Sequence, residues 1–275
     1  QGSWISGRRR VPVMNRLHGL WSLGTVVGGF VAAQAAAAGV SLRTHLLVAS
    51  VVFLGVVVFV GRGLLTEDEH VADDERPDGG ERPRARGRKA LILLGVASGC
   101  SIAMEMTSSD WAAFRLSDDF GADPGVAGLA YVAFTVGMTS GRFGGDWVVA
   151  RFGGRRIFDV AIGLTIVALA VASFGPNQWV VIAAYAAAGL GIATQFPKLY
   201  DDAARHPGRP GAGLGALTGG SRIALLGTPL IVGGLAGSDL SVGAATAVVT
   251  IPAALVFLAV HRAADRAAPE RGTNH

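Results

Sequence analysis

The stretch Thr44-His-Leu-Leu-Val-Ala-Ser-Val-Val-Phe-Leu-Gly-Val-Val-Val-Phe-Val-Gly61 contains no Asp, Glu, Lys or Arg and is built mainly of Val, Leu and Phe. A helix needs about 20 apolar residues to cross the hydrocarbon layer of a bilayer, and this stretch is close to that length. Its apolar side chains would cover every side of the helix, which leaves no polar face for water. The stretch therefore predicts a transmembrane helix.

Seven other apolar blocks of similar length share this pattern. We place them at residues 18–38, 90–110, 125–145, 156–174, 178–197, 211–237 and 242–260. Only 16% of the residues are charged, against about 25% in an ordinary soluble domain. The 40 glycines also suit helices that pack closely in lipid. The sequence predicts an all-α integral membrane protein with about eight transmembrane helices.

A charged segment, residues 62–89, separates the first two blocks from the other six. It holds eight acidic and seven basic residues, together with Pro77 and Pro83. A segment of this composition cannot bury a hydrophobic core. We expect an N-terminal segment (1–17), two transmembrane helices (18–61), this linker (62–89), a six-helix transmembrane half (90–260) and a C-terminal tail (261–275).

The positive charges predict which way the helices cross the membrane. Of the 24 Lys and Arg residues, 21 fall in the N-terminal segment, the linker, the tail and alternate loops between the blocks. Cytoplasmic loops retain Lys and Arg. We therefore expect a multi-pass protein of the cell membrane, of the inner membrane in a bacterium, with both termini on the cytoplasmic side.

Several other classes of protein are disfavoured by what the sequence lacks. The basic residues form no stripe interleaved with aromatic side chains, so we expect no nucleic-acid partner. Cys100 is the single cysteine and the six histidines have no metal-ligand spacing, so we expect no metal site and no cofactor. No catalytic motif of a hydrolase, metalloprotease or nucleotide-binding enzyme occurs, so we assign no catalytic residue.

The segment Gly141-Arg-Phe-Gly-Gly-Asp-Trp-Val-Val-Ala-Arg-Phe-Gly-Gly-Arg-Arg156 joins two predicted helices on the expected cytoplasmic side. It resembles the signature loop of the major facilitator superfamily, in the form found between helices eight and nine. In that family the charges of the loop stabilise one state of the alternating-access cycle. The resemblance therefore implies a gating role for Gly145, Asp146, Arg151, Gly153, Arg155 and Arg156.

Other blocks fit the same register. The block with Glu105 and Asp110 resembles helix seven of some bacterial members, Pro197 would end helix ten, and residues 227–234 resemble helix eleven. Residues 22–29 resemble the glycine-rich helix five. The chain thus resembles helices five to twelve of twelve, and we expect helices one to four to be missing from it. The resemblance implies a secondary active transporter that moves a small solute by alternating access, coupled to protons.

Few ionisable or amide side chains lie within the predicted helices. A charge at the centre of a bilayer costs roughly 2.5–3.5 kcal/mol on insertion scales, so each needs a partner or a function. We expect Glu105 and Arg222 to face the interior of the bundle or a water-filled cavity, either as a structural ion pair or as substrate and proton-coupling groups. Asp110, Gln34 and Gln195 are further substrate candidates.

Glycines at every fourth position predict close helix contacts. Gly137, Gly141 and Gly145 form one such stripe, and Gly24 and Gly28 begin another. Small residues at this spacing let two helix backbones approach each other.

Three functions remain open at this point. The first is a secondary transporter, present as a partial chain, whose partners are the bilayer, a small solute and protons. The second is a truncated membrane protein without transport activity, or an assembly partner. The third, an enzyme using Glu105 and Asp110, lacks a second group of catalytic residues facing Glu105.

Overall fold

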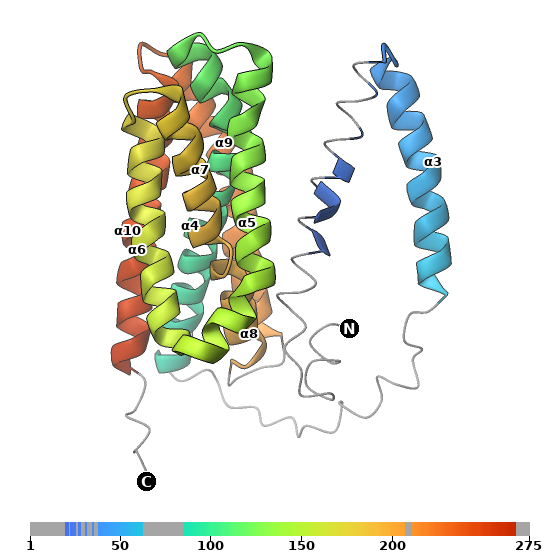
Figure 1. The fold of residues 1–275 in the computed structure, drawn as a ribbon. Coiled ribbons are helices and arrows are strands. Elements are labelled where there is room, and N and C mark those ends of the chain that lie inside the picture. Colours follow the sequence, from blue (N-terminus) through green and yellow to red (C-terminus); the bar gives the residue numbers. More distant parts are fainter. Residues whose placement is uncertain are drawn as a thin grey trace. The chain divides into compact units, whose positions relative to one another are not determined.

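The computed structural model describes residues 38–62, 85–206 and 211–267, with a few isolated positions between residues 20 and 35 (Figure 1). Most of the predicted first helix, the N-terminal segment, most of the linker and the end of the tail lie outside these residues. The described part contains helices and turns and no β-strand. The chain divides into two compact units, of which one contains α3 and the other contains α4 to α10.

Helix α3 (Leu42–Gly61) contains the apolar stretch from Thr44 to Gly61. Ser41 caps its N-terminus, because the hydroxyl oxygen accepts a hydrogen bond from the backbone N–H of Thr44 at 3.2 Å. No residue of this helix is buried, although its mean hydropathy is 2.4. A helix that is apolar on all sides and exposed on all sides requires lipid or other protein around it.

The second unit is a bundle of seven helices. They are α4 (Ala85–Phe120), α5 (Pro124–Phe152), α6 (Gly154–Phe174), α7 (Gln178–Ile192), α8 (Gln195–Ala204), α9 (Ala212–Ala236) and α10 (Val242–Ala267). Within the described residues, six helical stretches are long and apolar enough to cross a membrane, and they include α3 and the continuous run through α7 and α8. The prediction of an all-α integral membrane protein is confirmed.

The connection between α5 and α6 differs from the prediction. We expected a loop from residue 146 to 155, but α5 continues to Phe152 and α6 begins at Gly154. Gly153 alone makes the turn, with φ of 87°, a conformation that favours glycine because it has no Cβ. Most of the segment that resembles the signature loop is therefore helical.

The end of α7 also differs from the prediction. Pro197 was expected to end a helix, but the helix breaks earlier, at Ala193 and Thr194, and Pro197 lies in the first turn of α8. Proline is tolerated there because the first N–H groups of a helix have no partner within the helix. Residues 198–204, expected at the start of the loop that follows block 178–197, instead belong to α8, where Lys198 and Asp202 form an ion pair at 2.6 Å.

Glycine contacts hold α5 against α7. A Cβ added at Gly141 would lie 3.0 Å from the Leu190 carbonyl oxygen, and one added at Gly137 would overlap the backbone of Ala186. From the opposite side, Gly189 approaches the backbone of Phe134. The predicted packing role of the Gly137 stripe is thus what the structure shows. At Gly24 and Gly28 an added Cβ would meet no atom within 4 Å, and their packing role stays a prediction.

Helices α4 and α9 run in the same direction and also touch through glycine. A Cβ added at Gly99 would lie 3.2 Å from the carbonyl oxygen of Gly220. The Ser98 hydroxyl donates to the Leu217 carbonyl oxygen at 2.8 Å, which ties the two helices together at this point. These contacts fix the position of the central helix α4 in the bundle.

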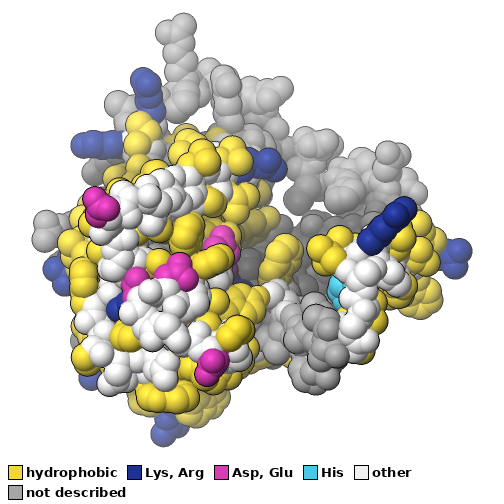
Figure 2. Space-filling model, turned by 90° about the horizontal axis from the view of Figure 1, so that it is seen from above, with side chains coloured by type: hydrophobic (Ala, Val, Ile, Leu, Met, Phe, Trp, Pro, Cys, Tyr) yellow, Lys and Arg dark blue, Asp and Glu magenta, His cyan; other side chains and the backbone are white. Residues whose placement is uncertain are grey.

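The end of the bundle at which α4 stops and α5 begins carries acidic side chains. Figure 2 looks onto this end and shows several Asp and Glu side chains among hydrophobic and neutral ones. Asp118 and Asp119 lie in the last turn of α4, Asp123 is the N-cap residue at the start of α5, and Asp239 lies in the turn between α9 and α10.

Candidate functional site

An ion pair lies deep inside the bundle between α4 and α5. Nη2 of Arg142 donates to Oε1 of Glu105 at 3.2 Å, and the side chains are 5% and 17% exposed. Glu105 is twenty positions from the start of α4 at Ala85 and fifteen from its end at Phe120, or about 30 and 22 Å along the axis at 1.5 Å per residue. The pair is therefore far from both ends of the helix.

Buried hydroxyl groups lie one helical turn from the pair. Ser101 and Ser108 flank Glu105 on α4, and Thr139 precedes Arg142 on α5. Within the described residues the hydroxyls of these three side chains are buried and make no hydrogen bond. We call these five residues the polar cluster. It offers one acidic side chain, one basic side chain and three hydroxyls in the interior of the bundle.

The partner of Glu105 was not foreseen. The sequence left open a pair of Glu105 with Arg222, but Arg222 is exposed on α9. Gly220 of α9 touches α4. Arg222 is two positions further along the helix, which corresponds to a rotation of about 200° around the helix axis. Arg222 therefore lies on the side of α9 opposite its contact with α4, and Glu105 pairs with Arg142 instead; the substrate or coupling role of Arg222 stays a prediction.

The sequence analysis gives Arg142 no role, because this residue lies near the cytoplasmic end of the predicted block 125–145. The signal was present in the sequence, since Arg142 is three residues inside the predicted block 125–145. A basic residue within a transmembrane segment usually pairs with an acid from another helix.

The remaining substrate candidates are dispersed. Asp110 is exposed and accepts a hydrogen bond from the neighbouring Ser109 at 3.0 Å. Five helical positions separate it from Glu105, which turns it about 140° away, so the structure does not bring the two acids together. Gln195 is fully buried, where its Nε2 donates to the Thr165 hydroxyl oxygen at 3.0 Å. Gln34 lies outside the described residues.

The residues to which the resemblance gives a gating role lie at the junction of α5 and α6. Gly145 is buried and an added Cβ would be 3.1 Å from Thr194 Cγ2. Arg151 is exposed in the last turn of α5, and Arg155 and Arg156 are exposed in the first turn of α6. The side chain of Asp146 lies outside what the structure describes. The gating role of this group stays a prediction.

A second buried ion pair lies near the acidic end of the bundle, where only loop charges were expected. Arg115 Nη1 donates to Asp119 Oδ2 at 2.7 Å, and Arg115 Nη2 donates to the Ser173 carbonyl oxygen at 3.1 Å, at the end of α6. Asp119 in turn accepts from the backbone N–H groups of Val242 and Gly243 at 3.0 and 2.8 Å, at the start of α10. Two side chains of α4 thus join three helices.

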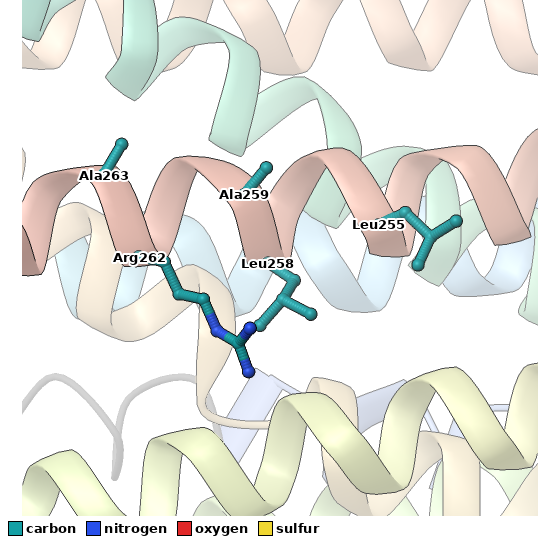
Figure 3. A pocket seen from close by; sticks show the side chains of 5 residues that line it. All are labelled: Leu255, Leu258, Ala259, Arg262 and Ala263. Atoms are coloured by element: carbon teal, nitrogen blue, oxygen red, sulfur yellow. The ribbon is translucent and has the colours of Figure 1, made fainter.

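No group of three or more His, Cys, Asp or Glu residues in the described ranges could hold a metal ion. One hollow of about 330 Å³ is lined by α10 alone, where Leu258 and Arg262 project from the helix near each other (Figure 3). A larger groove of about 600 Å³ lies between α4 and α9. Neither is lined by a residue of the polar cluster.

Comparison with known proteins gives three relatives at modest identity. The chain is 27% identical over 198 residues to an uncharacterised transporter of Sinorhizobium fredii, and the aligned region covers 70% of this chain and 50% of the relative. It is 29% identical over 195 residues to the membrane protein MosC of Rhizobium meliloti, covering 70% and 45%. It is 24% identical over 205 residues to an uncharacterised MFS-type transporter of Yersinia pestis, covering 74% and 51%.

The chain spans about half the length of these curated relatives. No family model matches it, and no solved structure gives a significant match. The similarity and the apolar helices together identify a multi-pass membrane protein related to proteins named as transporters.

Proposed function

We propose that the chain forms part of a secondary active transporter that moves a small solute across the cell membrane by alternating access, coupled to protons. The observation that carries this proposal is the Glu105–Arg142 pair in the middle of a bundle of apolar helices. The relatives named as transporters support the class of activity.

The chemistry of the polar cluster suits proton coupling. Glu105 as a carboxylate neutralises Arg142, and a proton on Glu105 would release the guanidinium for another acceptor. The hydroxyls of Ser101, Ser108 and Thr139 can donate to or accept from a polar solute. Protonation and solute binding would then compete for the same small set of groups, which couples the two.

Glu105→Gln tests this role. We expect proton-driven flux in proteoliposomes to fall about 100-fold, because glutamine keeps the shape but cannot take up a proton. The measurement uses a longer chain with four additional helices and a radiolabelled solute, found by a screen of sugars, amino acids and organic acids, that this longer chain moves when it carries no substitution. Asp118→Asn is the matched control, since Asp118 is an exposed acid at the end of the same helix.

A double variant separates a structural role from a functional one. Glu105→Gln alone breaks a buried ion pair, and breaking such a pair destabilises a bundle. Glu105→Gln with Arg142→Gln removes both charges and is expected to restore stability but not flux. If the double variant transports with the pH dependence of the unaltered protein, the pair is only structural and the proposal fails.

The proposal includes the orientation expected from the positive charges. In a Cys100→Ala background, a membrane-impermeant maleimide added to whole cells should label a cysteine at Asp118 but not one at Asp78. Asp118 is preferred to its neighbour Asp119 because it is exposed and joins no other helix. Labelling of the cysteine at position 78 alone would mean that the protein has the opposite orientation in the membrane.

The alternative function is a membrane protein that does not transport, or one that assembles with other helices. The exposed face of α9 favours further helices or lipid at this position, since Ile223, Leu226 and Leu230 are each more than 70% exposed. We expect the 275-residue chain to give no flux when reconstituted alone. Flux at the rate of a longer chain with four additional helices would show that these residues suffice.

A further inference from the structure

The groove between α4 and α9 is apolar along almost its whole length. Its walls include Ile92 and Ile223, which are 57% and 76% exposed. Its floor is formed by Gly95, Gly99 and Gly220, where the two helix backbones touch. Because glycine has no side chain, the two helices cannot fill this groove themselves, and its volume of about 600 Å³ stays open.

The groove has the length of one leaflet of a bilayer. The α4 residues that line it run from Arg88 to Cys100, which is about 18 Å along the helix at 1.5 Å per residue. One leaflet of hydrocarbon is about 15 Å thick, half of the usual 30 Å. An acyl chain that enters at the level of Arg88 would therefore reach the other end of the groove, at Cys100, near mid-membrane.

The open end of the groove is positively charged. Arg88 lines it and is exposed, and Lys89 follows on the same turn. Neither α4 nor α9 has an acidic residue in its first turn, and both helices begin at this end. Their N-terminal N–H groups add further positive potential. A guanidinium in this position favours a phosphate group.

We propose that this groove binds an anionic phospholipid, with one acyl chain on the glycine floor and the phosphate on Arg88. Basic pockets between transmembrane helices bind lipid head groups of this kind. In the orientation proposed above, the lipid belongs to the cytoplasmic leaflet. The site contains no residue of the polar cluster and does not depend on transport.

The test is a competition between two lipids on the purified full chain. The protein is incubated in detergent with equal amounts of phosphatidylglycerol and phosphatidylcholine, and the bound lipid is identified by native mass spectrometry. We expect phosphatidylglycerol to be preferred, and Arg88→Gln to reduce this preference about fivefold. Lys89→Gln is the matched control, because Lys89 is equally basic and exposed but does not line the groove.

A second variant tests the acyl chain. Val96 lines the groove and is 40% exposed, so Val96→Trp should fill the groove without disturbing the contact of the two backbones. We expect this variant to lose bound lipid of either kind while eluting as the unaltered protein in size-exclusion chromatography. The proposal is overturned if neither lipid is preferred, if Arg88→Gln and Lys89→Gln act equally, or if Val96→Trp keeps its lipid. The last two results would place the lipid elsewhere on the surface.

Discussion

Replacing Asp119 with alanine is expected to lower the free energy of unfolding by about 3–5 kcal/mol, because Arg115 would be left buried without its carboxylate. The Arg115 side chain is 7% exposed and the Asp119 side chain 11%, so water replaces little of the lost interaction. The start of α10 also loses the carboxylate that accepts from Val242 and Gly243. Loss of a helix cap alone costs about 1 kcal/mol.

The loss is measured by thermal unfolding in detergent, followed through the reaction of Cys100 with a fluorogenic maleimide. Cys100 is the single cysteine and is half-buried in α4. Asp118→Ala is the control, because the Asp118 carboxylate is exposed and accepts only from the adjacent Ser117 among the described contacts. We expect that change to stay within about 0.5 kcal/mol. Equal effects of the two substitutions would mean that the buried pair does not stabilise the bundle.

The existence of the helices could be predicted from the sequence because the membrane imposes a simple rule. A block of about 20 apolar residues has few alternatives to a helix in lipid, where every backbone N–H and C=O must bond within its own segment. The predicted block 211–237 accordingly coincides closely with α9, and block 242–260 begins where α10 begins, although α10 continues to Ala267. The close contact at Gly137 was predictable for a related reason, since only small residues allow it.

The ends of the helices were less predictable, because hydropathy indicates which residues lie in the hydrocarbon layer and not where the helix itself begins and ends. Helix α4 runs on from the predicted end at Asp110 to Phe120, and its last turns hold Arg115 and Asp119. These residues were placed in a loop because they are charged. Their spacing of four positions was a usable signal, since opposite charges at that spacing lie on one face of a helix.

The composition of the candidate site depended on tertiary structure. Glu105 was singled out by the cost of its burial, but its partner could not be chosen from one sequence. Arg222 and Arg142 were both basic residues within predicted blocks. The choice between them follows from which face of each helix meets α4. On α9 the contact at Gly220 turns Arg222 away from α4, whereas Arg142 of α5 reaches Glu105.

Replacing Gly189 with alanine is expected to destabilise the bundle by at least about 3 kcal/mol, at the upper end of the cost of overpacking. The added Cβ would overlap the backbone carbonyl of Phe134 and lie 2.9 Å from the backbone nitrogen of Met138. Backbone atoms in a helix cannot move aside as a flexible side chain can. The whole of α7 must therefore shift away from α5, which also separates Gly141 from Leu190.

Gly163→Ala is the matched control for this prediction. Gly163 lies in the middle of α6 on an exposed face, and an added Cβ would meet no atom within 4 Å. Alanine is favoured over glycine within a helix by about 0.5–1 kcal/mol, so this variant should be slightly more stable than the unaltered protein. The two variants carry the same chemical change and should move the Cys100 unfolding temperature in opposite directions. If both raise it, α5 and α7 are not in backbone contact at Gly189, and the packing described here for these helices is wrong.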